Sequence, residues 1–272
     1  MVQSGHHQCQ WEKVEVGVFA GPNSDILLTV NQSNISGLVI DQLQLYYDLG
    51  RAFSYNGTGA TVKDLSGNGR DATMYNAGGS TYSSTTPGAP SFNESRMGEF
   101  VFDGNDFGKF STITSSSNIT VSVWCKTTNS DRENGIISHC SGGPVNLGYS
   151  IFGNKMKYWY YDTTWRTASS TASVNDGNWK NLVWAKSGTS MLMYINGSLD
   201  STHTLNSSVT GSLVSFGCLW GPCNSDSYGA GTDSYSQAFI GTIGAVMIHS
   251  KQLSASEVSQ NYTAHQRRFT TS

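Results

Sequence analysis

The chain has 272 residues, only 13% of them charged, and its formal net charge is −3. Binding to a phosphate backbone requires a basic face, and a membrane span requires about 20 consecutive apolar residues. The sequence offers neither, so we expect no nucleic acid and no membrane among its partners. The length suits one β-sandwich domain with a short extension.

The first 36 residues predict a separate segment. Apolar residues alternate with polar or small ones over 14–18 and again over 26–30, on either side of the turn-forming run Gly21-Pro22-Asn23. This pattern predicts a β-hairpin. A lone hairpin is marginal in water, so it must pack on the chain's own sheet or on another chain. We therefore divide the chain into an extension or attachment segment, 1–36, and a main domain, 37–272.

The cysteines and the N-terminus bear on the compartment. The first residues, MVQSGHHQCQWEK, lack the apolar core of a secretory signal, so no exported precursor is expected. The chain has five Cys, among which Cys125 with Cys140 and Cys218 with Cys223 are candidate pairs. Without export, we expect free thiols.

Alternating apolar residues predict strands through most of the main domain. The expected strands are 99–110, 119–126, 135–140, 149–152, 155–161 and 240–249, with loops at 55–82 and 220–235. Between them, 176–200 reads as three consecutive antiparallel strands. Its first strand is apolar on both faces, which is typical of a central strand. The dipeptide Asn196-Gly197 predicts a type I′ hairpin turn.

One helix is expected, over 254–268. Ser254 and Glu257 have the spacing of a capping box, in which each side chain satisfies a free backbone N–H at the start of a helix.

Four stretches in this order resemble laminin-G-like, concanavalin A-like jelly-roll domains: Asp64–Asp71, Glu99–Asp106, Trp179–Gly197 and Ile240–Glu257. The resemblance covers residues 37–269 and makes 37–49 the first strand. It implies an all-β fold: a two-sheet antiparallel jelly-roll sandwich with an N-terminal β-hairpin extension and a short C-terminal helix. Function stays open, because this architecture hosts lectins, adhesins, enzymes and virion parts alike.

Two clusters of acids and amides suit calcium, which prefers oxygen ligands. They are Asp103, Asn105 and Asp106, and, as a second set, Asp64, Asn68 and Asp71. Polar turns explain both clusters without a metal. The resemblance implies a further acid in the closing strand, but Gly244-Ala245 stands there instead and removes that ligand. Calcium is thus the only cofactor considered, and none is required.

The sequence does not predict an enzyme. Glycosidases need two carboxylates roughly 5 to 9.5 Å apart. The Glu-x-Asp-x-x-Glu run of jelly-roll glucanases is missing, as are the His-Glu-x-x-His and Gly-x-Ser-x-Gly motifs. We therefore assign no catalytic residue.

The densest aromatic stretch, Met156–Trp165, predicts a binding face. On a strand, Tyr158 and Tyr160 point to one side, and Trp159 and Tyr161 to the other, so one pair lies away from the core. Sugars stack on such rings while polar neighbours bind their hydroxyls. The candidate carbohydrate-binding residues are Trp159, Tyr161, Trp165 and Trp220, the last two from loops. A protein contact would use the same rings, and this alternative stays open.

The ending, with Gln260-Asn-Tyr262 and Arg267-Arg-Phe269, resembles the close of laminin-G-like domains in tailed-phage structural proteins, those of cyanophages in particular. This implies a non-enzymatic virion structural protein, a decoration or adhesion module of capsid or tail, assembled in the host cytoplasm. It would bind other virion proteins through 1–36, bind a host surface glycan through the jelly roll, and occur in many copies or as a homo-oligomer. The alternative is a free or cell-surface carbohydrate-binding lectin.

Overall fold

The computed structural model describes residues 37–75, 91–92, 98–104, 106–138, 147–219 and 237–270. The predicted hairpin within 1–36 lies outside these ranges. The elements, in chain order, are β1 (Leu43–Asp48), β2 (Thr61–Val62), β3 (Ala72–Tyr75), β4 (Ser91–Phe92), β5 (Phe100–Asp103), β6 (Phe107–Ser115), β7 (Asn118–Lys126), β8 (Asn134–Ser138), β9 (Leu147–Phe152), β10 (Lys155–Tyr161), β11 (Trp165–Ser169), β12 (Lys180–Ser187), β13 (Ser190–Ile195), β14 (Ser198–Thr204), β15 (Gly211–Phe216), β16 (Ile240–His249) and α1 (Ala255–Thr270).

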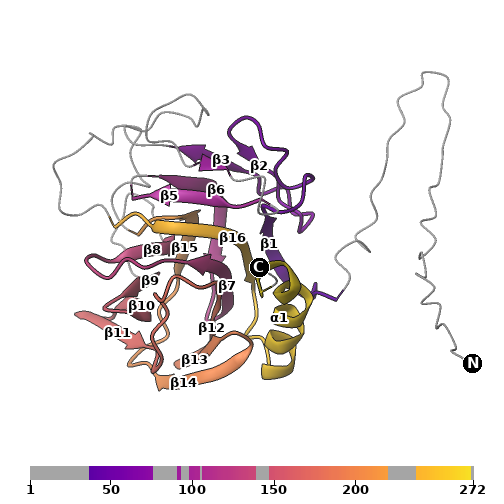
Figure 1. The fold of residues 1–272 in the computed structure, drawn as a ribbon. Helices are drawn as coiled ribbons and strands as arrows, with labels where there is room; N and C mark the ends of the chain where they lie inside the picture. The colour runs from indigo at the N-terminus through magenta and orange to yellow at the C-terminus, as the bar shows by residue number, and fades with distance from the viewer. Residues whose placement is uncertain are drawn as a thin grey trace, which may run out of the picture. The chain divides into compact units, whose positions relative to one another are not determined.

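The strands form two antiparallel sheets that pack as a sandwich (Figure 1), which confirms the predicted fold class. Sheet A has the order β14-β13-β12-β7-β16-β5-β4, and β1 also pairs with β16. Sheet B has the order β11-β10-β9-β8-β15-β6-β3-β2. One side of the sandwich therefore ends in two edge strands, β14 and β11.

Strand β12 occupies the central position that its apolar sequence predicts, between β7 and β13. Leu182 and Trp184 point into the space between the sheets, where both are fully buried. Val183 and Ala185 belong to a second cluster, on the outer face of sheet A. Replacing Trp184 by Ala would cost about 3 to 5 kcal/mol of folding free energy through lost burial and the cavity left behind.

The turn between β13 and β14 also has the predicted form. Asn196 and Gly197 have φ angles of 51° and 77°, so both adopt the left-handed conformation that a type I′ turn demands. The turn places Ile195 opposite Ser198 and sets the register of edge strand β14.

Two sequence predictions require correction. The expected strand 99–110 is two strands in different sheets, because the chain leaves sheet A after Asp103 and enters sheet B at Phe107. Trp165, expected in a loop, begins strand β11, where it pairs with Tyr161. Neither result follows from alternation alone, since both depend on pairing with distant strands.

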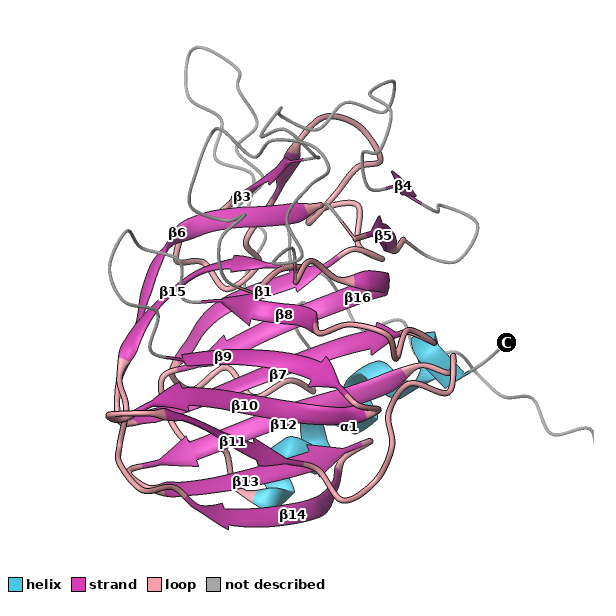
Figure 2. Ribbon diagram, turned by 90° about the vertical axis from the view of Figure 1, so that its left-hand side faces the viewer, coloured by secondary structure: helices cyan, strands magenta, loops and turns pink. Residues whose placement is uncertain are grey.

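Helix α1 covers the outer face of sheet A, on the far side of the sandwich from sheet B in Figure 2. Its predicted capping box is present: the backbone N–H of Glu257 donates to Ser254 Oγ at 3.3 Å, and that of Ser254 donates to Glu257 Oε2 at 2.8 Å. Near the other end of the helix, Phe269 stacks on Trp124 of β7 with ring centroids 4.4 Å apart. Trp124 is consequently only 2% exposed.

The thiols differ from expectation in one respect. Cys125 is free and buried, as expected. Cys218 is disulfide-bonded. The prediction of free thiols was argued from the compartment, whereas bridging depends on which sulfurs the fold brings together. In the described ranges, no helix has the length and apolar character needed to cross a bilayer.

Candidate functional site

Strand β10 presents alternate residues to opposite sides of sheet B. Met156, Tyr158 and Tyr160 face the core and are at most 3% exposed. Trp159 and Tyr161 lie on the outer side, with Trp159 half-buried and Tyr161 43% exposed. The predicted division of these aromatic residues is correct, and the outward pair is Trp159 with Tyr161.

Four outward rings gather on three neighbouring strands, β9, β10 and β11. We call the surface formed by Phe152, Trp159, Tyr161 and Trp165 the aromatic face. The ring centroids of Tyr161 and Trp165 lie 5.4 Å apart in an edge-to-face arrangement, and those of Phe152 and Trp159 lie 6.5 Å apart. Phe152 is 40% and Trp165 47% exposed. Large apolar rings exposed in a group are rare on a soluble domain and indicate a binding surface.

A chain of hydrogen bonds holds the indole of Trp159 in place. Its Nε1–H donates to Ser150 Oγ at 3.1 Å, and the Ser150 hydroxyl donates to Glu133 Oε1 at 2.5 Å. Burial raises the pKa of Glu133, and the hydrogen bonds from Ser150 and Trp159 oppose that shift. Trp159 is therefore oriented before any ligand arrives, which lowers the entropic cost of binding.

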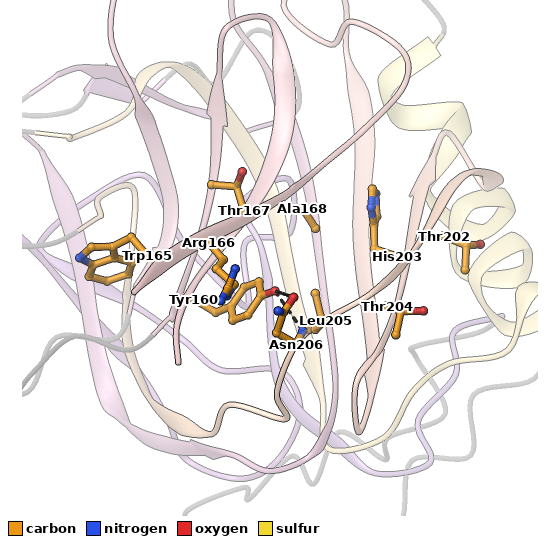
Figure 3. Close-up of a pocket in the computed structure, with 10 residues that line it drawn as sticks. All are labelled: Tyr160, Trp165, Arg166, Thr167, Ala168, Thr202, His203, Thr204, Leu205 and Asn206. Atoms are coloured by element: carbon orange, nitrogen blue, oxygen red, sulfur yellow. Dashed lines mark hydrogen bonds between the residues drawn. The ribbon is translucent and has the colours of Figure 1, made fainter. Parts of the chain in front are cut away.

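A groove of about 510 Å³ adjoins the aromatic face, between edge strands β11 and β14 (Figure 3). Its lining is rich in hydroxyl, amide and cationic groups. The residues are Tyr160, Trp165, Arg166, Thr167, Ala168, Thr202, His203, Thr204, Leu205 and Asn206. Trp165 belongs to both surfaces and joins them.

Three polar groups of the groove are held by contacts within it or with adjacent residues. In Figure 3, Tyr160 and Asn206 meet at its centre, where the backbone N–H of Asn206 donates to the Tyr160 hydroxyl at 3.2 Å. Arg166 Nε lies 2.7 Å from Asp162 Oδ2 in an ion pair. His203 Nε2 lies 3.2 Å from Ser201 Oγ. A polar groove beside exposed rings can bind hydroxyl-rich molecules.

Of the four predicted carbohydrate-binding residues, the structure brings Trp159, Tyr161 and Trp165 together; Trp220 lies outside the described residues. Sequence reasoning missed Phe152, Ser150 and Glu133. Phe152 follows Ser150 by two residues in β9, so strand alternation could have placed both outward. Nothing in the sequence pairs Glu133 with Ser150, because that contact depends on the fold.

Two of the three residues of the predicted calcium loop, Asp103 and Asp106, lie within the described residues. Asp103 and Asp106 do meet: the backbone N–H of Asp103 donates to Asp106 Oδ2 at 3.3 Å. Burial, together with the nearby charge of Asp103, raises the pKa of Asp106 to about 8, so its charged form is disfavoured. Arg132 Nη2 donates to the Gly104 carbonyl at 2.8 Å and already supplies a positive charge. Asn105 lies outside the described residues.

The second predicted cluster closes a turn. Asp64 accepts hydrogen bonds from the backbone N–H groups of Tyr46, Ser66 and Arg70. Asp71 accepts one from Asp64, and the Asn68 amide donates to the Leu43 carbonyl. These side chains replace backbone partners rather than collecting around an ion. Across the described ranges, no three His, Cys, Asp or Glu residues form a metal-binding group.

The ring of Phe269 occupies the space where the resemblance would place an acid in the closing strand. A Cβ at Gly244 would overlap the ring of Phe269, at a point where β16 bulges between Ile243 and Ala245. No carboxylate can occupy this place while α1 covers it.

Comparison with known proteins identifies the family. The family model described as the concanavalin A-like lectin/glucanases superfamily, of the Laminin_G_3 type, matches residues 102–259, more than half of the chain. The chain belongs to this superfamily. A comparison with curated proteins finds no match.

Solved structures of the same fold include carbohydrate-binding proteins. Domain 4 of AbnA, an extracellular arabinanase from Geobacillus stearothermophilus solved with arabinotriose, has a TM-score of 0.58 and 18% identity, covering 81% of this chain and 98% of its own. The receptor-binding domain of botulinum neurotoxin type G has a TM-score of 0.55 and 20% identity over 82% of this chain. A third structure is of botulinum neurotoxin type C, whose cell entry is described as dependent on interaction with two ganglioside molecules. It has a TM-score of 0.57 and 12% identity over 86% of this chain. The chain spans 51% and 53% of the two toxin chains.

Proposed function

We propose that this superfamily member is a non-enzymatic carbohydrate-binding module that a virion displays on its capsid or tail. The aromatic face supplies the stacking surface for sugar rings, and the adjoining groove supplies partners for hydroxyl groups. One observation carries the proposal: Tyr161 and Trp165 are both more than two-fifths exposed and pack edge to face on paired strands.

The chemistry of the surface matches that of a saccharide. A pyranose presents C–H groups on one side, which pack on an aromatic ring, and hydroxyl groups at its rim, which need polar partners. Within the groove, Arg166, Thr167 and Asn206 provide such partners beside Trp165. The arabinotriose bound by the AbnA domain and the gangliosides of the type C toxin support glycan binding as a use of this fold.

The carboxylates at this end of the sandwich support a binding role over hydrolysis. Glu133 is buried and accepts the Ser150 hydrogen bond, while Asp162 is paired with Arg166. A glycosidase needs one carboxylate as acid and a second as base or nucleophile, both facing the sugar. We propose that neither group acts in catalysis, so bound oligosaccharides should be recovered uncleaved.

The second part of the proposal is that a virion displays the domain. The resemblance of 260–269 to tailed-phage domains supports it. We propose that 1–36 attaches the chain to other virion proteins and that many copies present their aromatic faces. The alternative is a free or cell-surface lectin. Disulfides persist in oxidising environments such as virion and cell surfaces, so the disulfide at Cys218 suits both the virion protein and the lectin.

Glycan binding can be tested with purified full-length protein on an array of surface oligosaccharides, followed by titration calorimetry with the best ligand. We expect Trp165→Ala to weaken binding about five- to thirtyfold, because stacking on one ring contributes on the order of 1 to 2 kcal/mol. Phe53→Ala is the matched control, since Phe53 is 70% exposed but lies in the loop between β1 and β2. Adding EDTA should not change the affinity.

Equal loss of binding in the Trp165 and Phe53 variants, or no binding by the wild type, would refute the aromatic face as the site. Attachment is tested separately by a chain that begins at Gly37. If 1–36 is the attachment segment, the shortened chain stays folded and binds glycan but no longer assembles onto particles. If it aggregates instead, the segment belongs to the domain.

A further inference from the structure

The aromatic face carries one cationic group, Lys157 of β10. Its Nζ lies 5.7 Å from the ring centroid of Phe152 and 6.0 Å from that of Trp159. Among the described residues, no hydrogen bond or ion pair is made to this ammonium. Within the described part of the chain, the charge thus lies beside two rings of the proposed sugar platform and has no carboxylate in direct contact.

The other described cations at this end of the sheet, Lys155 and Arg166, each have a polar partner in the protein. Lys155 donates to the Thr171 carbonyl, and Arg166 is paired with Asp162. The acid whose charge interacts with that of Lys157 is Glu133, which is buried and accepts a hydrogen bond from the Ser150 hydroxyl. Its charge acts on Lys157 only at a distance. Among the described cations here, Lys157 is therefore the one whose charge has no hydrogen-bonding partner in the protein.

The rings beside Lys157 do not satisfy its hydrogen-bonding capacity. A cation near an aromatic face gains electrostatic attraction from the ring, but the ring accepts none of the three N–H donors in a directed bond. Water fills them in the free protein. A ligand carboxylate replaces that water with a charge-assisted hydrogen bond, which is stronger than a bond to a neutral hydroxyl.

We propose, resting on glycan binding by the aromatic face, that this face selects saccharides that bear a carboxylate. One sugar ring stacks on the indole of Trp159, where its carboxylate binds Lys157 Nζ, and a further ring of the same oligosaccharide stacks on Trp165. Uronic acids and sialic acids share this chemistry. The selection is local, because the whole chain has a net charge of −3 and does not attract anions over a long range.

The test uses full-length protein and matched pairs of ligands. Oligogalacturonate, oligoglucuronate and sialyllactose are each compared with their carboxylate methyl esters, which keep the sugar and remove the charge. Calorimetry should show the acid of at least one pair binding about tenfold or more tighter than its ester. Lys157→Met should abolish this difference, while Lys157→Arg should preserve it.

Lys109→Met is the control, because Lys109 is exposed on β6, which β9, β8 and β15 separate from β10. It should bind like the wild type, and matching thermal melts establish that every variant is folded. Equal binding of acids and esters, or binding of neutral oligosaccharides alone, overturns this inference and leaves glycan binding intact. Failure of every acid, ester and neutral ligand contradicts the proposed function itself.

Discussion

The two outer faces of the sandwich carry similar aromatic residues, which are buried on one face and exposed on the other. The outer face of sheet A carries Trp124, which is 2% exposed because Phe269 and Tyr262 of α1 both stack on it. The outer face of sheet B carries Trp165, which is 47% exposed. The same strand alternation places both indoles away from the core. Whether a helix covers the face decides whether the ring stabilises the fold or is available to a ligand.

The comparison is tested most strongly at Trp124. Trp124→Ala removes a ring stacked on two others and opens a cavity beneath α1, so the free energy of unfolding should fall by about 3 to 5 kcal/mol. Urea denaturation followed by circular dichroism measures the change. An unaltered midpoint would show that the covered face contributes little to stability.

A buried histidine in the helix that covers sheet A should also make the fold less stable in acid. His265 of α1 is buried beside Tyr46, with Asp48, Arg51 and Arg268 around it, and burial, with the charge of Arg51, lowers its pKa to about 4. The unfolded chain therefore binds a proton between pH 6.5 and 4 that the folded chain does not. Stability should fall by about 2 to 3 kcal/mol as the pH drops through this window.

Denaturation midpoints at pH 7 and pH 4.5 measure this effect, and His265→Gln should remove most of the difference between them. A variant with the same pH dependence as the wild type would assign the acid sensitivity to other groups.

A smaller loss is expected at the contact between strand and helix. Gly244→Ala introduces a Cβ that overlaps the ring of Phe269, and the resulting overpacking should cost about 1 to 3 kcal/mol. A thermal melt of the variant is the measurement. Full stability would mean that the end of α1 moves away freely and does not cover β16 tightly.

The smallest effect on stability is expected on the uncovered face. Trp165→Ala removes a ring that is nearly half exposed, so the free energy of unfolding should change by about 0.5 kcal/mol or less, although we expect the same variant to bind glycan more weakly. The urea titration used for Trp124→Ala applies here. A loss comparable to that of the Trp124 variant would make Trp165 a structural residue and remove the contrast between the faces.

Local sequence predicted the elements that local chemistry determines. The capping box at Ser254 and the turn at Asn196-Gly197 formed as predicted, because each depends on residues a few positions apart. The outward position of Trp159 and Tyr161 followed from strand alternation. The recognised resemblance supplied the two-sheet architecture, which no local pattern specifies.

Features that depend on distant pairing were not predictable in this way. Alternation continues through 99–110, and only pairing with β16 on one side and with β3 on the other shows that the chain changes sheets there. The short, polar strand β11 gave too weak a signal to separate it from a loop. The hydrogen bond from Ser150 to Glu133, which orients the central ring of the site, joins segments that only the fold brings together.

The contacts of α1 also place the first described residues on the side of the domain opposite the aromatic face. Gln260 Nε2 donates to the Gly37 carbonyl at 3.0 Å, and Asn261 Oδ1 accepts from the backbone N–H of Val39 at 2.8 Å. The described chain therefore begins and ends beside the same helix, on the side of sheet A. A tether fused at either of these points would leave from the side opposite the aromatic rings. Molecules immobilised on a sensor through that helix would point Trp165 and Lys157 toward the solution.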